Sequence, residues 1–342
     1  MEKIHVHQSL AKAVAEHGVK TMFGLMGDAN LFLVDSFVRD CGGQFVPAAH
    51  EASSVLMALA YTQVTGKIGV ASITHGPALT NTATALTEGV RGKAPVVLLA
   101  GDTPVANPRH LQSIDQRELV KATGAGFEQL RTPETVAADV ARAFYRAAVE
   151  RRPIVLNMPA DFMWQEVAHT RQVLDVFSAP GGVSEGGILD EAIGMIASAR
   201  APIILAGAGA IDARDTLIKL ADRLEAPLAT TLKAKGLFTG HKYDMDIFGT
   251  LSTPAAYELI DKADCIVCFG TGLHSFTTDQ GKLVKNKRVI QIDIEPTAIG
   301  NSVHPDAGLV ADAGLTAETI AWWLDEAEIP GSGFTRDIDP GT

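Results

Sequence analysis

The sequence predicts an α/β protein built from two doubly wound domains with mainly parallel sheets. Three observations support this fold class. The chain has 342 residues, which is long for one hydrophobic core and suits two domains of ordinary size. Short apolar runs typical of buried strands alternate with helical stretches along both halves. A stretch rich in Gly, Pro and Ser, residues 178–187, reads as a linker. We therefore predict a first domain over residues 1–177, a second over 188–328 and a flexible tail over 329–342.

Strand-like and helical patterns can be placed along the first half of the chain. Strands are expected at residues 21–24, 45–49, 68–74, 95–100 and 153–159, and helices at 7–18, 31–37, 52–65, 82–88 and 133–150. Asp28 precedes the second of these helices and is placed to cap it. The polar loop at 101–116 is longer than most connections, which makes it a candidate functional loop.

The second half repeats this organisation with a new sheet. Strands are expected at residues 202–206, 227–231, 265–270 and 288–294, with a helix at 213–223. The turn Gly207-Ala208-Gly209 resembles part of a dinucleotide fingerprint, but Asp212 stands where the third glycine belongs. A plain tight turn and a nucleotide site both remain open for it.

Composition and charge exclude several classes of function. The formal net charge is −11 and no cluster of Lys and Arg offsets it, which argues against nucleic-acid binding. No apolar run reaches the ~18 residues that span a bilayer, and the N-terminus lacks a signal-peptide pattern, so we expect a cytoplasmic protein without membrane contact. Cys265 and Cys268 lie inside an apolar strand, which favours buried thiols over a redox pair.

Polar residues at strand-to-helix turns are the candidate site residues. Glu51 follows the apolar run at 45–49 and stands at the head of a helix, and residues 74–81 occupy the turn after the next strand. Because ligands gather at the carboxyl ends of strands in open α/β sheets, these turns and the loop at 101–116 should converge on one crevice. Taken alone, the local sequence favours a simpler role for Glu51, that of a carboxylate stabilised by the helix dipole.

Several short motifs occur in a characteristic order. In the first half they are Phe23-Gly24-x-x-Gly27, His50-Glu51, Thr74-x-Gly76-Pro77-x-x-Thr80-Asn81, Pro95-Val96-Val97 and Gln112-x-x-Asp115. In the second half they are residues 202–207, 226–231, Lys235-Gly236 and 292–296. Together these motifs resemble the thiamine-diphosphate-dependent enzymes of the acetolactate synthase type. The first half resembles their pyrimidine-binding domain, and the second half resembles their Rossmann-like central domain.

The resemblance implies a catalytic role for Glu51. In this family a glutamate hydrogen-bonds N1′ of the cofactor's aminopyrimidine and promotes the imino tautomer, which removes the C2 proton of the thiazolium. Such a carboxylate requires a dry apolar pocket, for which residues 46–49 are suitable neighbours. The implied reactions are decarboxylation of a small 2-oxo acid and carboligation, in which the activated aldehyde passes to an acceptor carbonyl. The enzyme would accordingly be a lyase or a transferase.

The resemblance also assigns roles to other turn residues. Those matched to the pyrimidine pocket are Leu25, Met26, Gly27, Thr74, Pro77 and Asn81. Gln112 matches a catalytic loop glutamine near the thiazolium and substrate. Alternative roles remain open: Thr74 and Pro77 could shape a turn, Asn81 could cap a helix, and Gln112 could be a surface amide. His75 stands where the family usually has a small residue, so three roles are open: it narrows the pocket, contacts the substrate or lies at the surface.

One expected part of the family does not occur within these residues. The family holds Mg²⁺ and the diphosphate with a Gly-Asp-Gly turn and a later asparagine, and residues 1–342 contain no such pattern. We therefore expect no metal ligand here. We expect a hetero-oligomer in which a separate diphosphate-binding subunit supplies the Mg²⁺ site and this chain also pairs with its own copy.

Other functions remain open at this point. A non-catalytic regulatory or scaffold relative of these enzymes would show the same motifs. The central domain could retain FAD or ADP, as it does in some members of the family. A nicotinamide-binding Rossmann enzyme would rest on the turn at Gly207–Gly209 alone.

Overall fold

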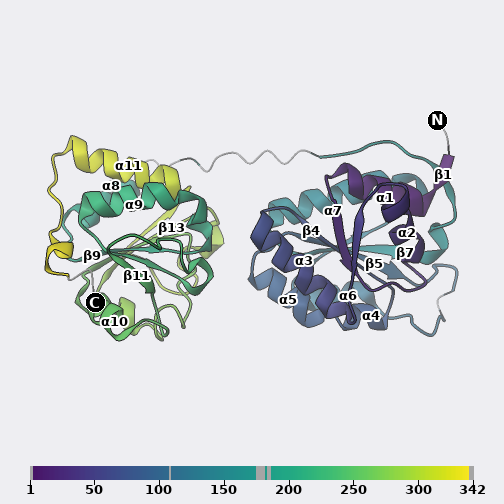
Figure 1. Cartoon of the computed structure of the whole chain (residues 1–342), viewed down its shortest axis with the longest axis horizontal. Coiled ribbons are helices and arrows are strands. Elements are labelled where there is room, and N and C mark those ends of the chain that lie inside the picture. Colours follow the sequence, from purple (N-terminus) through teal and green to yellow (C-terminus); the bar gives the residue numbers. More distant parts are fainter. Residues whose placement is uncertain (1–2, 108, 175–181, 183–185, 339–342) are drawn as a thin grey trace. The chain divides into compact units, whose positions relative to one another are not determined.

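The computed structural model describes residues 3–107, 109–174, 182 and 186–338. The chain divides into two compact units, Met1–Phe177 and Ser178–Thr342, and each has its own hydrophobic clusters (Figure 1). Most of the predicted linker at 178–187 lies outside the described residues.

The first unit is built on a six-stranded sheet in the order β3-β2-β4-β5-β7-β6. Its strands are β2 (Thr21–Gly24), β3 (Gln44–Pro47), β4 (Gly69–Ile73), β5 (Val96–Asp102), β6 (Gly126–Gln129) and β7 (Ile154–Pro159). All of their pairings are parallel. A separate antiparallel pair joins β1 (Lys3–His5) to β8 (Glu166–Ala168). The predicted doubly wound sheet is confirmed for this unit.

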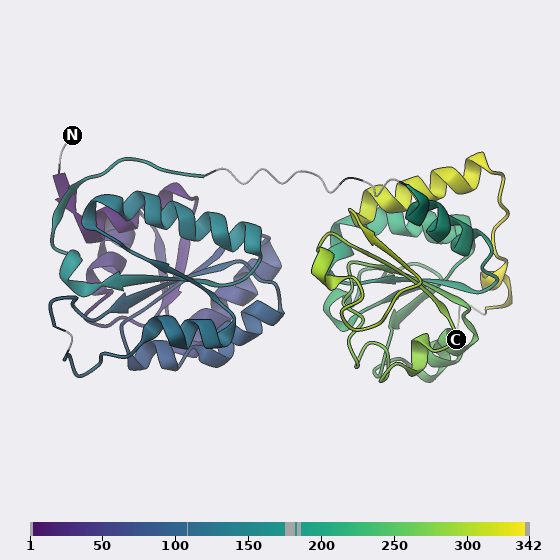
Figure 2. The ribbon, with the colours of Figure 1, turned by 180° about the vertical axis from the view of Figure 1, so that it is seen from behind.

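Helices cover both faces of this sheet (Figure 2). They are α1 (Val6–Glu16), α2 (Leu31–Arg39), α3 (Glu51–Thr65), α4 (Pro77–Thr80), α5 (Ala83–Arg91), α6 (Gln116–Thr123) and α7 (Val136–Glu150). Side chains of α1, α2 and α7 form one cluster against the sheet, and those of α3, α5 and α6 form the other. The strands between these layers are almost wholly buried at β4, β5 and β7, which explains their continuous apolar sequences.

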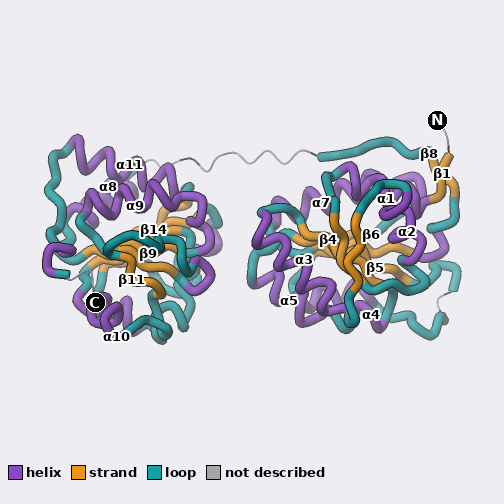
Figure 3. Tube along the Cα trace, viewed as in Figure 1, coloured by secondary structure: helices purple, strands orange, loops and turns teal. Residues whose placement is uncertain are grey.

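The second unit repeats the layered plan, with strands lying between helices (Figure 3). Its sheet has the order β11-β10-β9-β12-β13-β14, and all pairings are parallel. The strands are β9 (Pro202–Ala206), β10 (Leu228–Thr230), β11 (Asp244–Ile247), β12 (Cys265–Phe269), β13 (Arg288–Asp293) and β14 (Ala307–Val310). The helices are α8 (Gly187–Ala197), α9 (Arg214–Leu224), α10 (Pro254–Lys262) and α11 (Ala313–Glu326).

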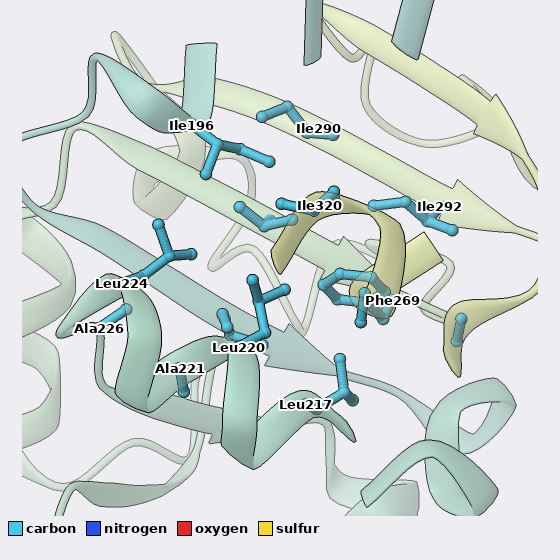
Figure 4. Packing of buried hydrophobic residues seen from close by; sticks show 14 of the residues in the cluster. Ile196, Leu217, Leu220, Ala221, Leu224, Ala226, Phe269, Ile290, Ile292 and Ile320 are labelled. Carbon is cyan, nitrogen blue, oxygen red and sulfur yellow. The ribbon is translucent and has the colours of Figure 1, made fainter. Parts of the chain in front are cut away.

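The larger core of the second unit lies under α8, α9 and α11 (Figure 4). Leu217, Leu220 and Leu224 recur at helical spacing on α9 and point toward the sheet, as expected for one apolar face of a helix. They meet Phe269 of β12 and Ile290 of β13 in the same cluster. On the opposite face of the sheet, α10 and the segments around it form a smaller cluster.

The structure contains elements that the sequence did not predict, and it orders part of a segment that was expected to be flexible. Helix α6 and strand β6 occupy residues 116–129, where no regular element was expected beyond the loop at 101–116. Part of the stretch predicted as a flexible tail packs instead. Glu225 accepts hydrogen bonds from the Gly333 backbone N–H at 2.8 Å and from the Arg336 guanidinium at 2.9 Å, and Thr335 is buried. An ion pair and a backbone contact thus hold a segment that has no periodicity of its own. None of the helices in the described ranges is long and apolar enough to cross a membrane.

Candidate active site

The carboxyl ends of neighbouring parallel strands bring the predicted turns to one edge of the first unit's sheet. The strands β3, β2, β4 and β5 lie side by side and point the same way. The chain passes from β2 to the edge strand β3 and then crosses back over β2 to β4, so β2 and β4 flank a topological switch point. In open α/β sheets such points bind ligands in the crevice outside the strand ends.

Glu51 is the first residue of α3 and lies just beyond the end of β3. Its side chain is half-buried, and Oε2 accepts a hydrogen bond of 2.9 Å from Nδ2 of Asn81. Asn81 follows α4, in the turn after β4, so this bond joins two of the turns. Among the described residues Oε1 has no hydrogen-bond partner. The carboxylate is therefore held by one oxygen and can accept a ligand's donor with the other.

The apolar run before Glu51 is more exposed than predicted. Strand β3 is an edge strand, and within residues 46–49 Pro47 and Ala49 are exposed, whereas Val46 and Ala48 are half-buried. The expected dry pocket around the carboxylate is thus not formed by these residues alone. Further surface must cover this edge before water is excluded from Glu51.

Thr74 links the turn after β4 to the turn after β2. Its hydroxyl donates to Oδ1 of Asp28 over 3.1 Å. A Cβ on Gly27 would lie 2.6 Å from Cβ of Thr74, so glycine is required for this close approach. Asp28 does not cap α2 as predicted, because α2 begins after Asn30 and Asp28 is engaged by Thr74. Asn30 instead accepts the Gly27 N–H at 2.8 Å and thereby shapes the turn.

The remaining residues matched to the pyrimidine pocket lie at the same edge. The Leu25 N–H donates to the carbonyl of Ser72 over 3.1 Å, which extends the β2–β4 pairing by one bond. Met26 is 49% exposed, and Pro77 is an exposed residue that starts α4. These positions leave the Met26 side chain free to contact a ligand or a partner.

His75 is buried, with 2% of its surface exposed. Its Nδ1 lies 3.2 Å from Oγ1 of Thr74 and 3.9 Å from Oδ1 of Asp28. Its ring lies 5.2 Å from that of His110, which belongs to the long loop. The surface alternative for His75 is wrong, because the loop after β5 covers this turn.

Gln112 lies in the long loop and its backbone contacts the turn after β4. A Cβ on Gly76 would lie 2.0 Å from the carbonyl oxygen of Gln112, and Gly76 has φ +60°, so only glycine suits this position. The Gln112 N–H donates to Nδ1 of His110 over 3.3 Å. The half-buried Gln112 is therefore held at the edge that carries Thr74 and His75.

A buried network of side-chain amides supports this edge, and it was not predicted from the sequence. Oε1 of Gln116 accepts the Gly76 N–H at 2.7 Å, and its Nε2 donates to the Gly101 carbonyl and to Oδ1 of Asn157. Asn157 in turn donates to Oδ2 of Asp102 over 2.6 Å. Gln116 and Asn157 are both buried, so each amide is oriented by its partners. The only sequence signal for this network is a polar residue inside the apolar strand β7.

The structure thus assembles the predicted residues into two groups at one edge. Glu51 and Asn81 form the first group, while Gly27, Thr74, His75 and the backbone of Gln112 belong to the second. Over the described ranges, no hydrogen bond connects the two groups, and no set of three acidic, His or Cys side chains is arranged to hold a metal ion.

The corresponding turn of the second unit is a tight packing contact. A Cβ on Gly207 would lie 2.2 Å from the carbonyl oxygen of Gly270, so this glycine lets the turn after β9 contact the turn after β12. This packing accounts for Gly207 without a nucleotide, and the FAD or ADP expectation stays a prediction. Cys265 and Cys268 are buried free thiols in separate core clusters, and burial raises the pKa of Cys265 to about 12. The buried-thiol interpretation is confirmed.

Fold and site together define a doubly wound α/β protein with a carboxylate at a strand-end ligand crevice. Comparison with known families identifies the family of this chain. Residues 4–119 match "Thiamine pyrophosphate enzyme, N-terminal TPP binding domain", and residues 189–320 match "Thiamine pyrophosphate enzyme, central domain". The chain belongs to the thiamine pyrophosphate enzymes and consists of these two domains within the residues compared.

Curated relatives include several enzymes. Sulfoacetaldehyde acetyltransferase of Rhodobacter capsulatus is 31% identical over 336 residues, covering 93% of this chain and 55% of the relative. A probable 2-ketoarginine decarboxylase of Pseudomonas aeruginosa is 30% identical, covering 92% and 57%. Acetolactate synthase isozyme 3 large subunit of Escherichia coli is 27% identical, covering 95% and 59%. The chain spans about half the length of the curated relatives it matches.

Proposed function

We propose that this chain holds the pyrimidine end of thiamine diphosphate in an enzyme that decarboxylates a 2-oxo acid or transfers the resulting acyl unit. One observation carries the proposal. Glu51 stands at the head of α3 with one carboxylate oxygen fixed by Asn81 and the other without a partner among the described residues. A carboxylate of this kind fits N1′ of an aminopyrimidine, because it accepts a hydrogen bond at a defined position.

The residues of the chain would act by binding and by holding a proton. When bound, thiamine diphosphate would supply an acidic thiazolium carbon as the nucleophile toward the carbonyl of a 2-oxo acid. Glu51 would keep a proton at N1′ of the pyrimidine, and Asn81 would orient the carboxylate for it. The turn of Gly27 and Thr74 would form a wall of the pyrimidine pocket. Gln112, whose backbone packs on the turn after β4, would contact the substrate, while the buried His75 would narrow the pocket from behind this wall.

The diphosphate and Mg²⁺ would be held by a domain that residues 1–342 do not contain. Two observations support a covering domain at this edge. Glu51 is only half-buried, so further surface is needed to exclude water from it. The long loop also exposes apolar side chains, with Leu111 at 91% and Val105 at 65%. We propose that a separate subunit brings this domain, and that assignment stays a prediction.

Self-association is proposed through α3. Leu56 and Val64 of this helix are 48% and 84% exposed, and the small residues Ser53 and Ala60 of the same helix are also exposed. This face carries no charge, which suits packing against the same face of a second copy, since a chain with net charge −11 repels its copy elsewhere. Pairing there would also bring further surface close to Glu51 at the head of the helix.

The test uses the complex as it purifies natively, with thiamine diphosphate, Mg²⁺ and pyruvate or another 2-oxo acid. The Glu51→Gln variant should lower kcat by about 10²–10⁴-fold. Glu88→Gln is the matched control, because Glu88 is an exposed carboxylate on α5 with no recorded side-chain hydrogen bond in the described structure. Unchanged turnover in Glu51→Gln would overturn the catalytic proposal and favour a regulatory or scaffold role.

A further inference from the structure

A cavity lies away from the candidate active site, at the amino end of the edge strand β6. Its volume is about 300 Å³. The lining residues come from α6, the α6–β6 turn, β6 and the region of α7, and they are Arg117, Lys121, Gly124, Ala125, Gly126, Phe127, Arg146 and Arg152. Because β6 is parallel to the other strands, its amino end is opposite the edge that carries Glu51. The cavity is therefore a separate feature, which we call the basic pocket.

Every charged residue that lines the basic pocket is a cation. This is unusual in a chain with 29 Lys and Arg against 40 Asp and Glu. Acidic partners do contact the cations, but Glu118, Glu128 and Glu150 are not part of the lining. The surface that faces a bound molecule is accordingly positive, and it favours an anion.

Arg117 is the cation with the most donors to offer. Its guanidinium lies 4.5 Å from the ring centroid of Phe127, in a cation–π contact. Among the described residues it makes no ion pair or hydrogen bond, so its N–H groups are free for a ligand. The aromatic contact orients the guanidinium plane without consuming those donors.

Arg146 and Arg152 are fixed in place by glutamates. Both donate to Glu150, and Arg146 also donates to Oε1 of Glu128 over 2.8 Å. Arg152 reaches the Gly124 carbonyl at 2.9 Å, which attaches it to the rim of the pocket. The hydrogen bonds that Arg146 donates to Glu150 outweigh the effect of burial and raise the pKa of Arg146, so it stays charged. Since these side chains are already ordered, binding an anion would sacrifice little of their freedom.

We propose that the basic pocket binds a small phosphate-bearing anion. Guanidinium groups match phosphate oxygens through paired N–H donors, and Lys121 adds a point charge at the rim. The volume admits a phosphate with a small organic group. The proposal is independent of thiamine binding, because it involves none of the residues around Glu51.

The test titrates the intact chain with inorganic phosphate and, separately, with ADP, and follows binding by calorimetry. Saturable binding of either is expected, weakened at least about tenfold in the double variant Arg117→Gln, Lys121→Gln. Both side chains are exposed, so the fold should persist, and a melting curve verifies this. The double variant Lys20→Gln, Lys67→Gln, which removes two exposed lysines of the same unit, is the charge-matched control and should bind normally.

The two probes distinguish the source of the phosphate. Binding of inorganic phosphate as tightly as ADP identifies the phosphate alone as the recognised group, whereas tighter ADP binding that also depends on Arg117 and Lys121 identifies a phosphate ester. No saturable binding of either probe up to about 10 mM would overturn the proposal. Equal affinity in the wild type and the double variant would overturn it as well, since the ligand would then occupy another site.

Discussion

Nδ2 of Asn81 donates to Oε2 of Glu51 over 2.9 Å and joins the turn after β4 to the head of α3. The two residues are 30 positions apart, and both belong to the set that the sequence matched to a pyrimidine pocket. The contact gives Glu51 a defined direction at a half-exposed edge, where an unsupported carboxylate would sample several rotamers.

The first prediction concerns this contact. Asn81→Ala should lower kcat of the native complex by about 10-fold or more, because Glu51 loses its orienting donor. The same substitution should have little further effect in a Glu51→Gln background, since the two residues act as a unit. Steady-state kinetics of the four proteins measure this coupling. Thr84→Ala, at an exposed position on α5, is the control, and additive losses would contradict the prediction.

The second prediction concerns the buried amide network. Gln116→Ala removes the side-chain partner of three groups, which are the Gly76 N–H, the Gly101 carbonyl and Oδ1 of Asn157. We expect the free energy of unfolding to fall by about 1–3 kcal/mol for each buried group left unpaired. Gln63→Ala, at an exposed position on α3, should change it by less than about 0.5 kcal/mol.

Urea unfolding can measure the free energy of unfolding of the first unit alone. The chain has three tryptophans, of which Trp164 lies in the first unit and Trp322 and Trp323 in the second. A Trp322→Phe, Trp323→Phe background therefore leaves one fluorescent reporter, Trp164. Equal midpoints for the two Gln variants in this background would show that the network contributes nothing to stability.

The third prediction separates backbone strain from steric clash. Gly76 and Gly42 both have positive φ, of +60° and +67°. A Cβ added at Gly76 would lie 2.0 Å from the carbonyl oxygen of Gln112, whereas a Cβ added at Gly42 would meet open space. Gly42→Ala should cost about 1 kcal/mol from φ alone. Gly76→Ala should also displace the long loop, which we expect to raise the rate of tryptic cleavage after Arg109 by about tenfold or more. Equal cleavage rates in the two variants would refute the loop contact.

The fourth prediction concerns pH. Burial lowers the pKa of His7, and nearby His5 lowers it further against the opposing charges of Asp40 and Asp35. Burial also lowers the pKa of His17, which stacks on Phe144 at 4.4 Å. In the unfolded chain these histidines have an ordinary pKa of about 6.5. Below that pH the unfolded chain therefore binds more protons than the folded chain, and the free energy of unfolding decreases.

The first unit should accordingly melt at a constant temperature above about pH 7 and at lower temperatures as the pH falls from about 6.5 to 5. The double variant His7→Gln, His17→Gln should flatten this profile. His304→Gln, at an exposed position in the second unit, should leave it unchanged. Melting followed by Trp164 in the single-tryptophan background measures the effect, and a profile that stays as steep in the double variant would exclude these histidines as its origin.

The buried strands and the starts of helices were predicted from local sequence patterns. The apolar runs of β4 and β5, and the position of Glu51 at the head of a helix, were predicted because burial and helix starts leave periodic and capping signals. Helix α6 was missed because it is short and polar, with Val120 and Gln116 as its buried residues. Strand β6 was missed because it is a short edge strand.

The contacts that build the site could not be predicted from sequence. Gln116 bonds to Gly76 across 40 residues and to Asn157 across 41, and no local pattern specifies such partners. The burial of His75 likewise results from the long loop that folds over it. The dry pocket expected around Glu51 was inferred from the apolar character of residues 46–49, but an edge strand leaves such residues partly exposed.

The most direct test of the account is the rate at which the C2 hydrogen of thiamine diphosphate exchanges with deuterium in the native complex, measured by quenched-flow NMR. If Glu51 acts through N1′, the exchange rate in Glu51→Gln falls by about 10²-fold or more, while Glu88→Gln exchanges like the wild type. An exchange rate in Glu51→Gln equal to that of the wild type, with cofactor bound, would contradict the central claim.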